Sequence, residues 1–122
     1  MIDRLYEKNG GGPTISKLVQ VFYERVQADP RLSRFFPQTD MDTLRARQAM
    51  FLTMLVGGSR SFNGRDLTTA HAGARAQGLN DADFDALLAH FEESLLQVGV
   101  AWDYIEDMLA LLEATRGAVL DR

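Results

Sequence analysis

The sequence predicts a single all-α domain over residues 1–122. Apolar residues recur at three- and four-residue spacing, Gly and Pro separate the segments that show this spacing, and no segment alternates in the manner of a strand. With 46% apolar and 25% charged residues, the composition is that of an ordinary soluble domain. A chain of this length can bury a core without disulfides or a structural metal.

The first predicted helix follows the break "NGGGPT" at residues 9–14. We expect Thr14 to serve as its N-cap. Its apolar face consists of Ile15, Leu18, Val19, Phe22, Tyr23 and Val26. The next segment, "DPRLSRFF", predicts a short helical turn that starts at Asp29–Pro30, since Pro suits the first position of a helix.

A third helix is predicted over "MDTLRARQAMFLTMLVGG", capped by Asp40 and ended by Gly57–Gly58. The stripe on its inner face is Leu44, Gln48, Phe51, Leu52 and Leu55. The segment "RDLTTAHAGA" at residues 65–74 is built from small residues around one of only two histidines, and Gly78 closes it.

Asn80 is predicted to cap the following helix, with acidic residues in the favourable first turn. The apolar face of this helix is Phe84, Leu87, Leu88, Phe91, Leu95 and Val98. A last helix is expected from about residue 101 to residue 120.

Composition excludes several classes of function. The absence of Cys excludes disulfide scaffolds, zinc–thiolate sites, iron–sulfur sites and thiol nucleophiles. A net charge of −4 without a basic run argues against nucleic-acid partners. No apolar run approaches the ~18 residues of a membrane span. The start of the chain, "MIDRLYEKNGGG", lacks the apolar stretch of a signal peptide, so we expect a cytoplasmic protein without membrane partners.

Two polar residues interrupt apolar faces. Gln48 lies among Leu44 and Phe51, where a buried amide without a partner would cost about 1–3 kcal/mol. Tyr23 shares a face with Val19 and Val26. An edge position for Gln48 and a core position for Tyr23 are the plain alternatives. Both groups could instead point into one cavity and share a polar ligand.

His71 is the candidate metal ligand. The chain has no Cys, no HxxxH pair and no carboxylate cluster beside His71, so a zinc site built from protein ligands alone does not fit. A single histidine can hold iron when a macrocycle supplies the other ligands, and small neighbours would let a flat ring approach. A surface or core histidine remains the alternative. His90 lies between Leu87 and Phe91, where a structural or surface role is expected.

Together these residues resemble a known family. The matching pieces are "FYERV", "DPRLSRFF", "TDM", "RQAMFLTMLVGG", "GRDLTTAHAG" and "GLNDADFDALLAHF". Their order and spacing over nearly the whole chain resemble a group I truncated haemoglobin. The resemblance implies a truncated globin, a two-over-two helical sandwich around haem b (iron protoporphyrin IX).

The resemblance also implies roles for individual residues. His71 matches the proximal iron ligand, and Phe36 matches an aromatic residue that wedges against the haem face. Tyr23 matches the distal tyrosine that donates to bound dioxygen, and Gln48 matches the polar residue that assists it. The positions that match the apolar haem lining are Leu44, where other globins often carry a distal histidine or glutamine, and Phe51, Leu67, Leu79 and Leu87.

Arg47 stands where some members of the family carry a histidine that coordinates the iron. Arginine does not ligate iron under ordinary conditions, so a hexacoordinate histidine state is not expected. Its guanidinium can instead reach a haem propionate through a charge-assisted pair. An arginine that simply faces solvent is the alternative.

The resemblance implies a haem protein that reversibly binds dioxygen, nitric oxide and carbon monoxide. The set of Leu44, Tyr23 and Gln48 resembles family members that convert nitric oxide to nitrate with bound dioxygen. Such a nitric oxide dioxygenase needs a reductase, whose identity stays open. The alternatives are oxygen storage, scavenging or ligand sensing without turnover, and a globin-shaped interaction module without haem. We expect a monomer or a weak dimer.

Overall fold

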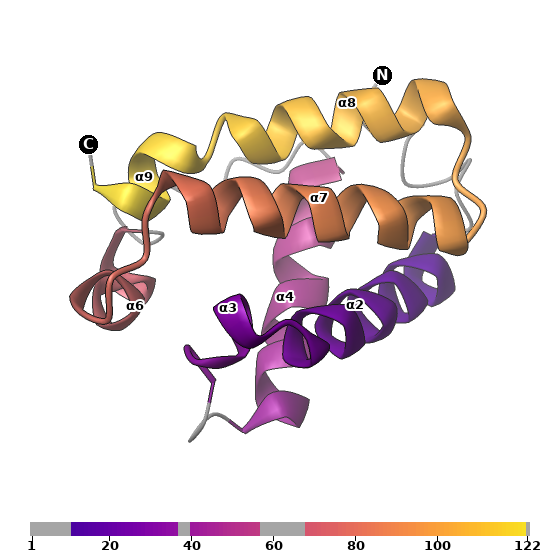
Figure 1. Cartoon of the computed structure of the whole chain (residues 1–122). Helices are drawn as coiled ribbons and strands as arrows, with labels where there is room; N and C mark the ends of the chain where they lie inside the picture. The colour runs from indigo at the N-terminus through magenta and orange to yellow at the C-terminus, as the bar shows by residue number, and fades with distance from the viewer. Residues whose placement is uncertain (1–10, 37–39, 57–67, 122) are drawn as a thin grey trace.

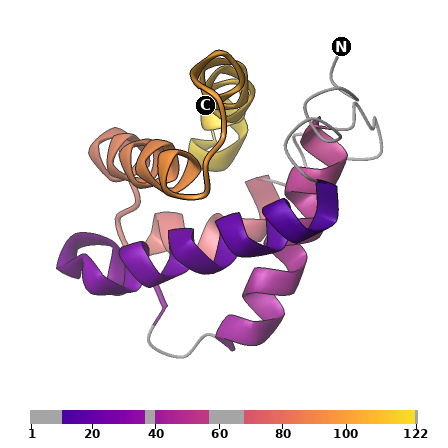
Figure 2. The same cartoon turned by 90° about the vertical axis from the view of Figure 1, so that its right-hand side faces the viewer.

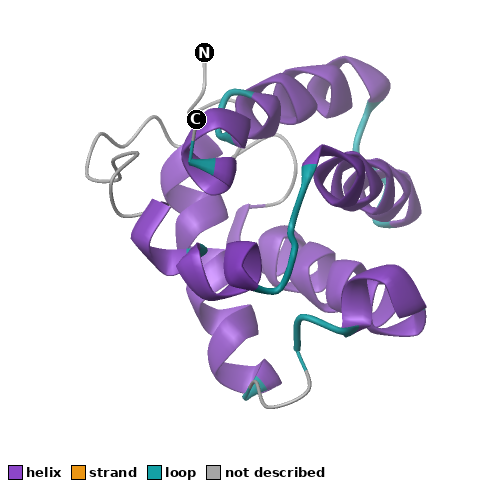
Figure 3. Cartoon of the chain, turned by 60° about the vertical axis from the view of Figure 1, so that its left-hand side comes forward, coloured by secondary structure: helices purple, strands orange, loops and turns teal. Residues whose placement is uncertain are grey.

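The computed structural model describes residues 11–36, 40–56 and 68–121. These residues form helices joined by loops, and the described parts contain no strand, as Figure 3 shows. The helices are α2 (Gly11–Ala28), α3 (Pro30–Ser33), α4 (Met41–Val56), α6 (Ala72–Ala76), α7 (Asp81–Gln97), α8 (Trp102–Glu113) and α9 (Arg116–Leu120). The all-α prediction is confirmed.

Two pairs of helices form two layers (Figures 1 and 2). In one layer α7 and α8 run antiparallel side by side, and in the other α2 crosses α4. Helix α2 joins the layers, because it packs against both α4 and α7. Among the described residues, no helix is long and apolar enough to cross a membrane.

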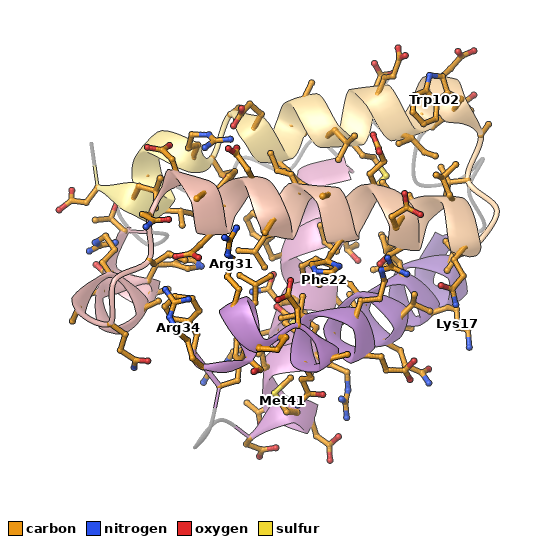
Figure 4. The ribbon with its side chains drawn as sticks, in the orientation of Figure 1. Lys17, Phe22, Arg31, Arg34, Met41 and Trp102 are labelled. Carbon is orange, nitrogen blue, oxygen red and sulfur yellow. The ribbon has the colours of Figure 1, made fainter. Side chains whose placement is uncertain are left out.

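The core lies where α2, α4, α7 and α8 meet. Its most deeply buried side chains come from each of these helices and from α3: Leu18, Val19, Val26, Leu32, Leu52, Leu95 and Ile105. Each buried Leu, Ile or Val stabilises the fold by about 1.5–3 kcal/mol relative to exposure. Figure 4 shows Phe22 pointing from α2 toward α7, where its ring meets Phe91 at 5.2 Å between centroids.

Most of the predicted helix starts are confirmed. Asp29 is the N-cap of α3, and its carboxylate accepts from the Arg31 amide at 2.9 Å. Asp40 accepts from the Asp42 amide at 3.1 Å at the start of α4. At α7, the side chain of Asn80 accepts from the Asp83 amide while Asp83 accepts in return, which completes a capping box.

The first helix starts earlier than predicted. Thr14 lies inside α2, which begins at Gly11, so its assignment as the N-cap is wrong. Pro13 is tolerated there because the first turn of a helix has no acceptors for its backbone N–H groups.

The last helix is divided, whereas one helix was predicted. Helix α8 ends at Glu113 and α9 begins at Arg116. At the break, the Thr115 hydroxyl donates to the carbonyl of Leu112 at 2.6 Å, and so competes for a backbone acceptor of the helix. Arg116 then pairs with Asp81 of α7 at 2.9 Å, which anchors the start of α9.

Two glycines end helices in the left-handed conformation. Gly78 (φ 98°) ends α6, and Gly99 (φ 87°) ends α7. In each case the amide of the next residue donates back to the helix: Leu79 to Ala74 and Val100 to Leu95, both at 3.1 Å. This bonding is that of a Schellman motif, which requires the conformation that glycine adopts without strain.

Candidate functional site

A cavity of about 920 Å³ lies between the two layers, within the range of ~300–1,000 Å³ of small-molecule and cofactor pockets. Its walls are mainly apolar and come from α2, α3, α4, α6, α7, α8 and α9. The apolar lining comprises Phe22, Leu32, Phe35, Phe36, Leu44, Met50, Phe51, Leu52, Leu79, Phe84, Leu87, Leu88, Phe91, Leu112 and Val119.

Tyr23 brings a phenol to this cavity from α2. Its side chain is buried, and its ring stands edge-on to Phe22 at 4.9 Å and to Phe36 at 6.0 Å between centroids. Its hydroxyl makes no hydrogen bond to another described residue. Burial raises the pKa of Tyr23, so the hydroxyl keeps its proton at neutral pH and can donate it to a ligand.

Helix α4 contributes the described part of the predicted stripe. Leu44, Gln48 and Phe51, spaced by four and three residues, are half-buried and line the cavity. The side-chain amide of Gln48 has no hydrogen-bond partner among the described residues. A second polar group with donors therefore faces the same cavity as Tyr23.

The cavity opens to solvent between α4 and α6. Arg47 and Met50 line it from α4 and are exposed, with 66% of Met50 accessible. Gly73 and Gln77 line it from α6 and its end and are also exposed. No described carboxylate forms an ion pair with Arg47, so its charge is available at the mouth.

His71 lies at a break between two helical stretches. Residues 68–70 are helical, His71 itself has φ −102° and ψ 7°, and α6 begins at Ala72. The imidazole is half-buried and lines the cavity beside Ala70 and Ala74. A Cβ added at Gly73 would meet nothing within 4 Å, so this wall leaves room close to the backbone.

Helix α9 holds the segment that carries His71. The Thr68 hydroxyl donates to the carbonyl of Ala118 at 2.8 Å, and Arg75 donates to the carbonyl of Val119 at 2.9 Å. Arg75 also donates to the carbonyl of Thr68 at 2.8 Å, which links the residues on both sides of His71. These contacts position the imidazole from outside the cavity.

The structure brings the described residues that were predicted for the site into one cavity. They are Tyr23, Phe36, Leu44, Arg47, Gln48, Phe51, His71, Leu79 and Leu87. Leu67 lies outside the described residues. Their individual roles stay predictions.

Other lining residues were not predicted from the sequence. Phe84 and Phe91 were recognised as an apolar helix face, but periodicity does not tell which part of such a face meets a cavity. Thr115 and Val119 line it from the break after α8 and from α9, a division that was not predicted. Phe35, next to the predicted Phe36, gave no separate signal.

The chemistry of the cavity suits a large flat apolar cofactor with a metal. The imidazole of His71 lines an apolar space. The phenol of Tyr23 and the amide of Gln48 line it from other helices, and neither has a hydrogen-bond partner among the described residues. Globins and peroxidases hold haem iron with a histidine imidazole. The residues present therefore fit a haem.

Comparisons with known proteins agree with this geometry. The family model of the bacterial-like globins matches residues 4–121. A group 1 truncated hemoglobin from Tetrahymena pyriformis is 37% identical over 97% of this chain and 95% of its own length. Another, from Synechocystis, is 39% identical over 93% of this chain and 90% of its own length.

Among solved structures, the chain is similar to the 2/2 hemoglobin from Synechococcus sp. PCC 7002, which carries a covalently attached heme. The TM-score is 0.89 and the identity 36%, over 97% of this chain and 98% of that one. The globin family and this haem-bearing relative make haem the cofactor. The chain therefore belongs to the bacterial-like globins and, within them, to the group 1 truncated haemoglobins.

Proposed function

We propose that this protein converts nitric oxide to nitrate with dioxygen bound at a haem that His71 holds. When bound, haem supplies an iron that takes up dioxygen; transfer of both oxygen atoms to nitric oxide gives nitrate and leaves the iron ferric. One observation carries the proposal. His71 lines the same cavity as two hydrogen-bond donors, Tyr23 and Gln48, and neither donor has a hydrogen-bond partner among the described residues.

Tyr23 would stabilise the bound diatomic ligand. A bound diatomic ligand that takes on partial negative charge would be stabilised by a hydrogen-bond donor here, because water screens charges poorly in an apolar cavity. Because burial raises the pKa of Tyr23, the phenol stays a donor at neutral pH. Its edge-on contacts with Phe22 and Phe36 restrict the ring.

Gln48 would add a second donor from α4. Two hydrogen bonds to a charged acceptor, each contributing about 1.5–3 kcal/mol, would slow ligand release by several orders of magnitude. Slow release disfavours delivery of oxygen and favours chemistry on the bound ligand. Leu44, one turn before Gln48, also lines the cavity but has no donor, so Tyr23 and Gln48 would be the donors to the ligand.

Arg47 would pair with a haem propionate at the mouth of the cavity. It is exposed, lines the opening and has no carboxylate partner among the described residues. A guanidinium suits a carboxylate because it offers two parallel N–H donors. This pairing would help to hold the haem at the mouth of the cavity.

We also propose that haem is held without a covalent bond to the protein. The chain has no Cys, and its two histidines are His71 and His90. His90 does not line the cavity, because its ring is held by Asp29 at 2.8 Å. Acid–butanone extraction should release all of the haem.

Each turnover leaves ferric iron, so the reaction needs an external electron donor. We propose a reductase as the partner, with the cytoplasm as the compartment. Without that donor, a protein of this design would act as a store or scavenger of dioxygen.

Mixing the dioxygen complex with nitric oxide in a stopped-flow instrument tests the proposal. We expect one nitrate ion to form per haem. We also expect the absorbance change to the ferric form to be complete on the stopped-flow timescale. Repeated turnover with an added reductase would make the protein an enzyme. Slow or substoichiometric nitrate would instead leave oxygen storage as the function. His71→Ala should lose haem on gel filtration, and retention of haem with an unchanged ferrous spectrum would refute His71 as the ligand.

A further inference from the structure

We propose that His90 is a positioning residue for the ligand pocket. By holding Asp29, its imidazole sets where α3 lies and therefore where Phe36 stands against Tyr23. The inference rests on the proposed role of Tyr23 and extends it to a residue that does not line the cavity.

The contact joins two distant parts of the chain. His90 Nε2 of α7 lies 2.8 Å from Asp29 Oδ2, across 61 residues of sequence. The two side chains are 21% and 27% exposed, so water competes only in part for this pair. The other oxygen of Asp29 accepts from the Arg31 amide at 2.9 Å. Asp29 therefore binds α7 with one oxygen and starts α3 with the other.

Helix α3 depends on such anchors because it has only four residues. A helix this short is unstable in isolation, since nucleation costs more than one turn returns. Three contacts hold it: Leu32 is fully buried, Asp29 meets His90 at the start, and the C-cap Arg34 pairs with Asp83 at 3.0 Å. The partners in both polar contacts, His90 and Asp83, belong to α7, which lies above α3 in Figure 1.

The position of α3 is passed directly to the cavity wall. The Phe35 amide donates to Leu32 at 3.1 Å and the Phe36 amide to Ser33 at 3.0 Å, so the helical turn continues to Phe36. The Phe36 ring then stands at 87° to the Tyr23 ring, with 6.0 Å between centroids. Because continuous helical hydrogen bonds join Asp29 to Phe36, a shift of Asp29 would also move the Phe36 ring.

Helix α7 is a firm base for this contact. Its start is fixed by the capping box of Asn80 and Asp83. Ser94, which is fully buried, donates to the backbone carbonyl of His90 at 2.7 Å. The backbone of α7 is thus the fixed side of the contact, and the short α3 is the side that it positions.

Three variants separate positioning from general stability. His90→Leu removes the ring nitrogens, and His90→Gln places an amide nitrogen that can still donate to Asp29. Asp29→Ser keeps an N-cap oxygen for the Arg31 amide but is too short to reach His90. The haem-loaded ferrous carbon monoxide complex is used throughout, with two measurements: the NOE between the Tyr23 and Phe36 rings, and the C–O stretching band.

We expect His90→Leu and Asp29→Ser to weaken the NOE and to shift or split the C–O band, while His90→Gln matches the unmodified protein. Dioxygen release should change by about threefold or more in the first two variants, a modest change in the barrier. If His90→Leu lowers the melting temperature but leaves both measurements unchanged, the inference is refuted. The same holds if His90→Gln behaves as His90→Leu does.

Two further outcomes separate a folding defect, and a failure of the proposed function, from a failure of this inference. If His90→Leu does not fold with haem, the same two measurements on Asp29→Ser decide whether the inference holds. The NOE reports ring geometry whether or not Tyr23 donates to a ligand. An unaltered dioxygen release in Tyr23→Phe would therefore refute the proposed function and leave this inference to stand or fall on the NOE.

Discussion

Replacement of Tyr23 by Phe removes one oxygen atom from the cavity wall and tests the proposed site most directly. The hydroxyl has no hydrogen-bond partner among the described residues, so the change breaks no hydrogen bond between them. The ring remains, with its edge-on contacts to Phe22 and Phe36. Stability should therefore stay close to that of the unmodified protein, since the buried ring and its aromatic contacts are kept.

The effect on the bound ligand should be large. A hydrogen bond to a charged acceptor contributes about 1.5–3 kcal/mol, and ~1.4 kcal/mol corresponds to tenfold in rate. We expect Tyr23→Phe to speed dioxygen dissociation at least about tenfold, and by about a hundredfold at the upper end of that range. Burial raises the pKa of Tyr23, so the effect should persist without change from neutral to mildly alkaline pH.

The assay is displacement of dioxygen by excess carbon monoxide, followed by stopped-flow absorbance. Tyr104→Phe is the matched control, since Tyr104 is a half-buried tyrosine of α8 that does not line the cavity. It should release dioxygen at the rate of the unmodified protein. An unchanged rate in Tyr23→Phe, or an equal change in both variants, would remove Tyr23 from the ligand site.

Three other predictions concern the frame around the site. Asn80→Ala should destabilise the protein by about 1–2 kcal/mol in urea unfolding, since it breaks the capping box with Asp83; no change would mean that α7 needs no cap. Leu95→Ala, at a fully buried position, should cost about 2–5 kcal/mol, and a loss below ~1 kcal/mol would contradict its place in the core. The hydrogen bond from His90 holds the pKa of Asp29 below its usual value, so its contribution is present above pH ~4 and is lost as the pH falls further. The gap in melting temperature between the unmodified protein and Asp29→Ser should thus shrink as the pH falls below about 4, and a gap that widens would reverse the assigned sign.

Local signals predicted the helix boundaries where side chains supply the missing backbone partners. Asp29, Asp40 and Asn80 each cap a helix as their sequence contexts indicate, and Gly78 ends α6 in the left-handed conformation. Thr14 failed as a cap because Pro and Gly can open a helix without one. The break before Arg116 was also missed, because it depends in part on the carboxylates of Asp81 and Asp85 in α7, which are distant in sequence and hold Arg116.

The site was predicted less completely. Tyr23, Gln48 and His71 stand out in sequence as polar groups on apolar or small-residue surfaces, but each had an ordinary alternative explanation. Family resemblance, and not periodicity, made them one site. Thr115 and the hydrogen bond of His90 with Asp29 carry no sequence signal, since each depends on a contact between segments far apart in the chain.

The sequence by itself determined that this protein is all-α and where most of its helices start, and its resemblance to a family indicated which side chains could serve a haem. The helices and their starts follow from apolar spacing and helix caps, which act over a few positions of the chain. Only the tertiary structure decided that α2, α4 and the segment of His71 enclose one cavity and that α9 and α7 hold its walls. Packing and long-range ion pairs join residues that are tens of positions apart, and no local pattern encodes those distances.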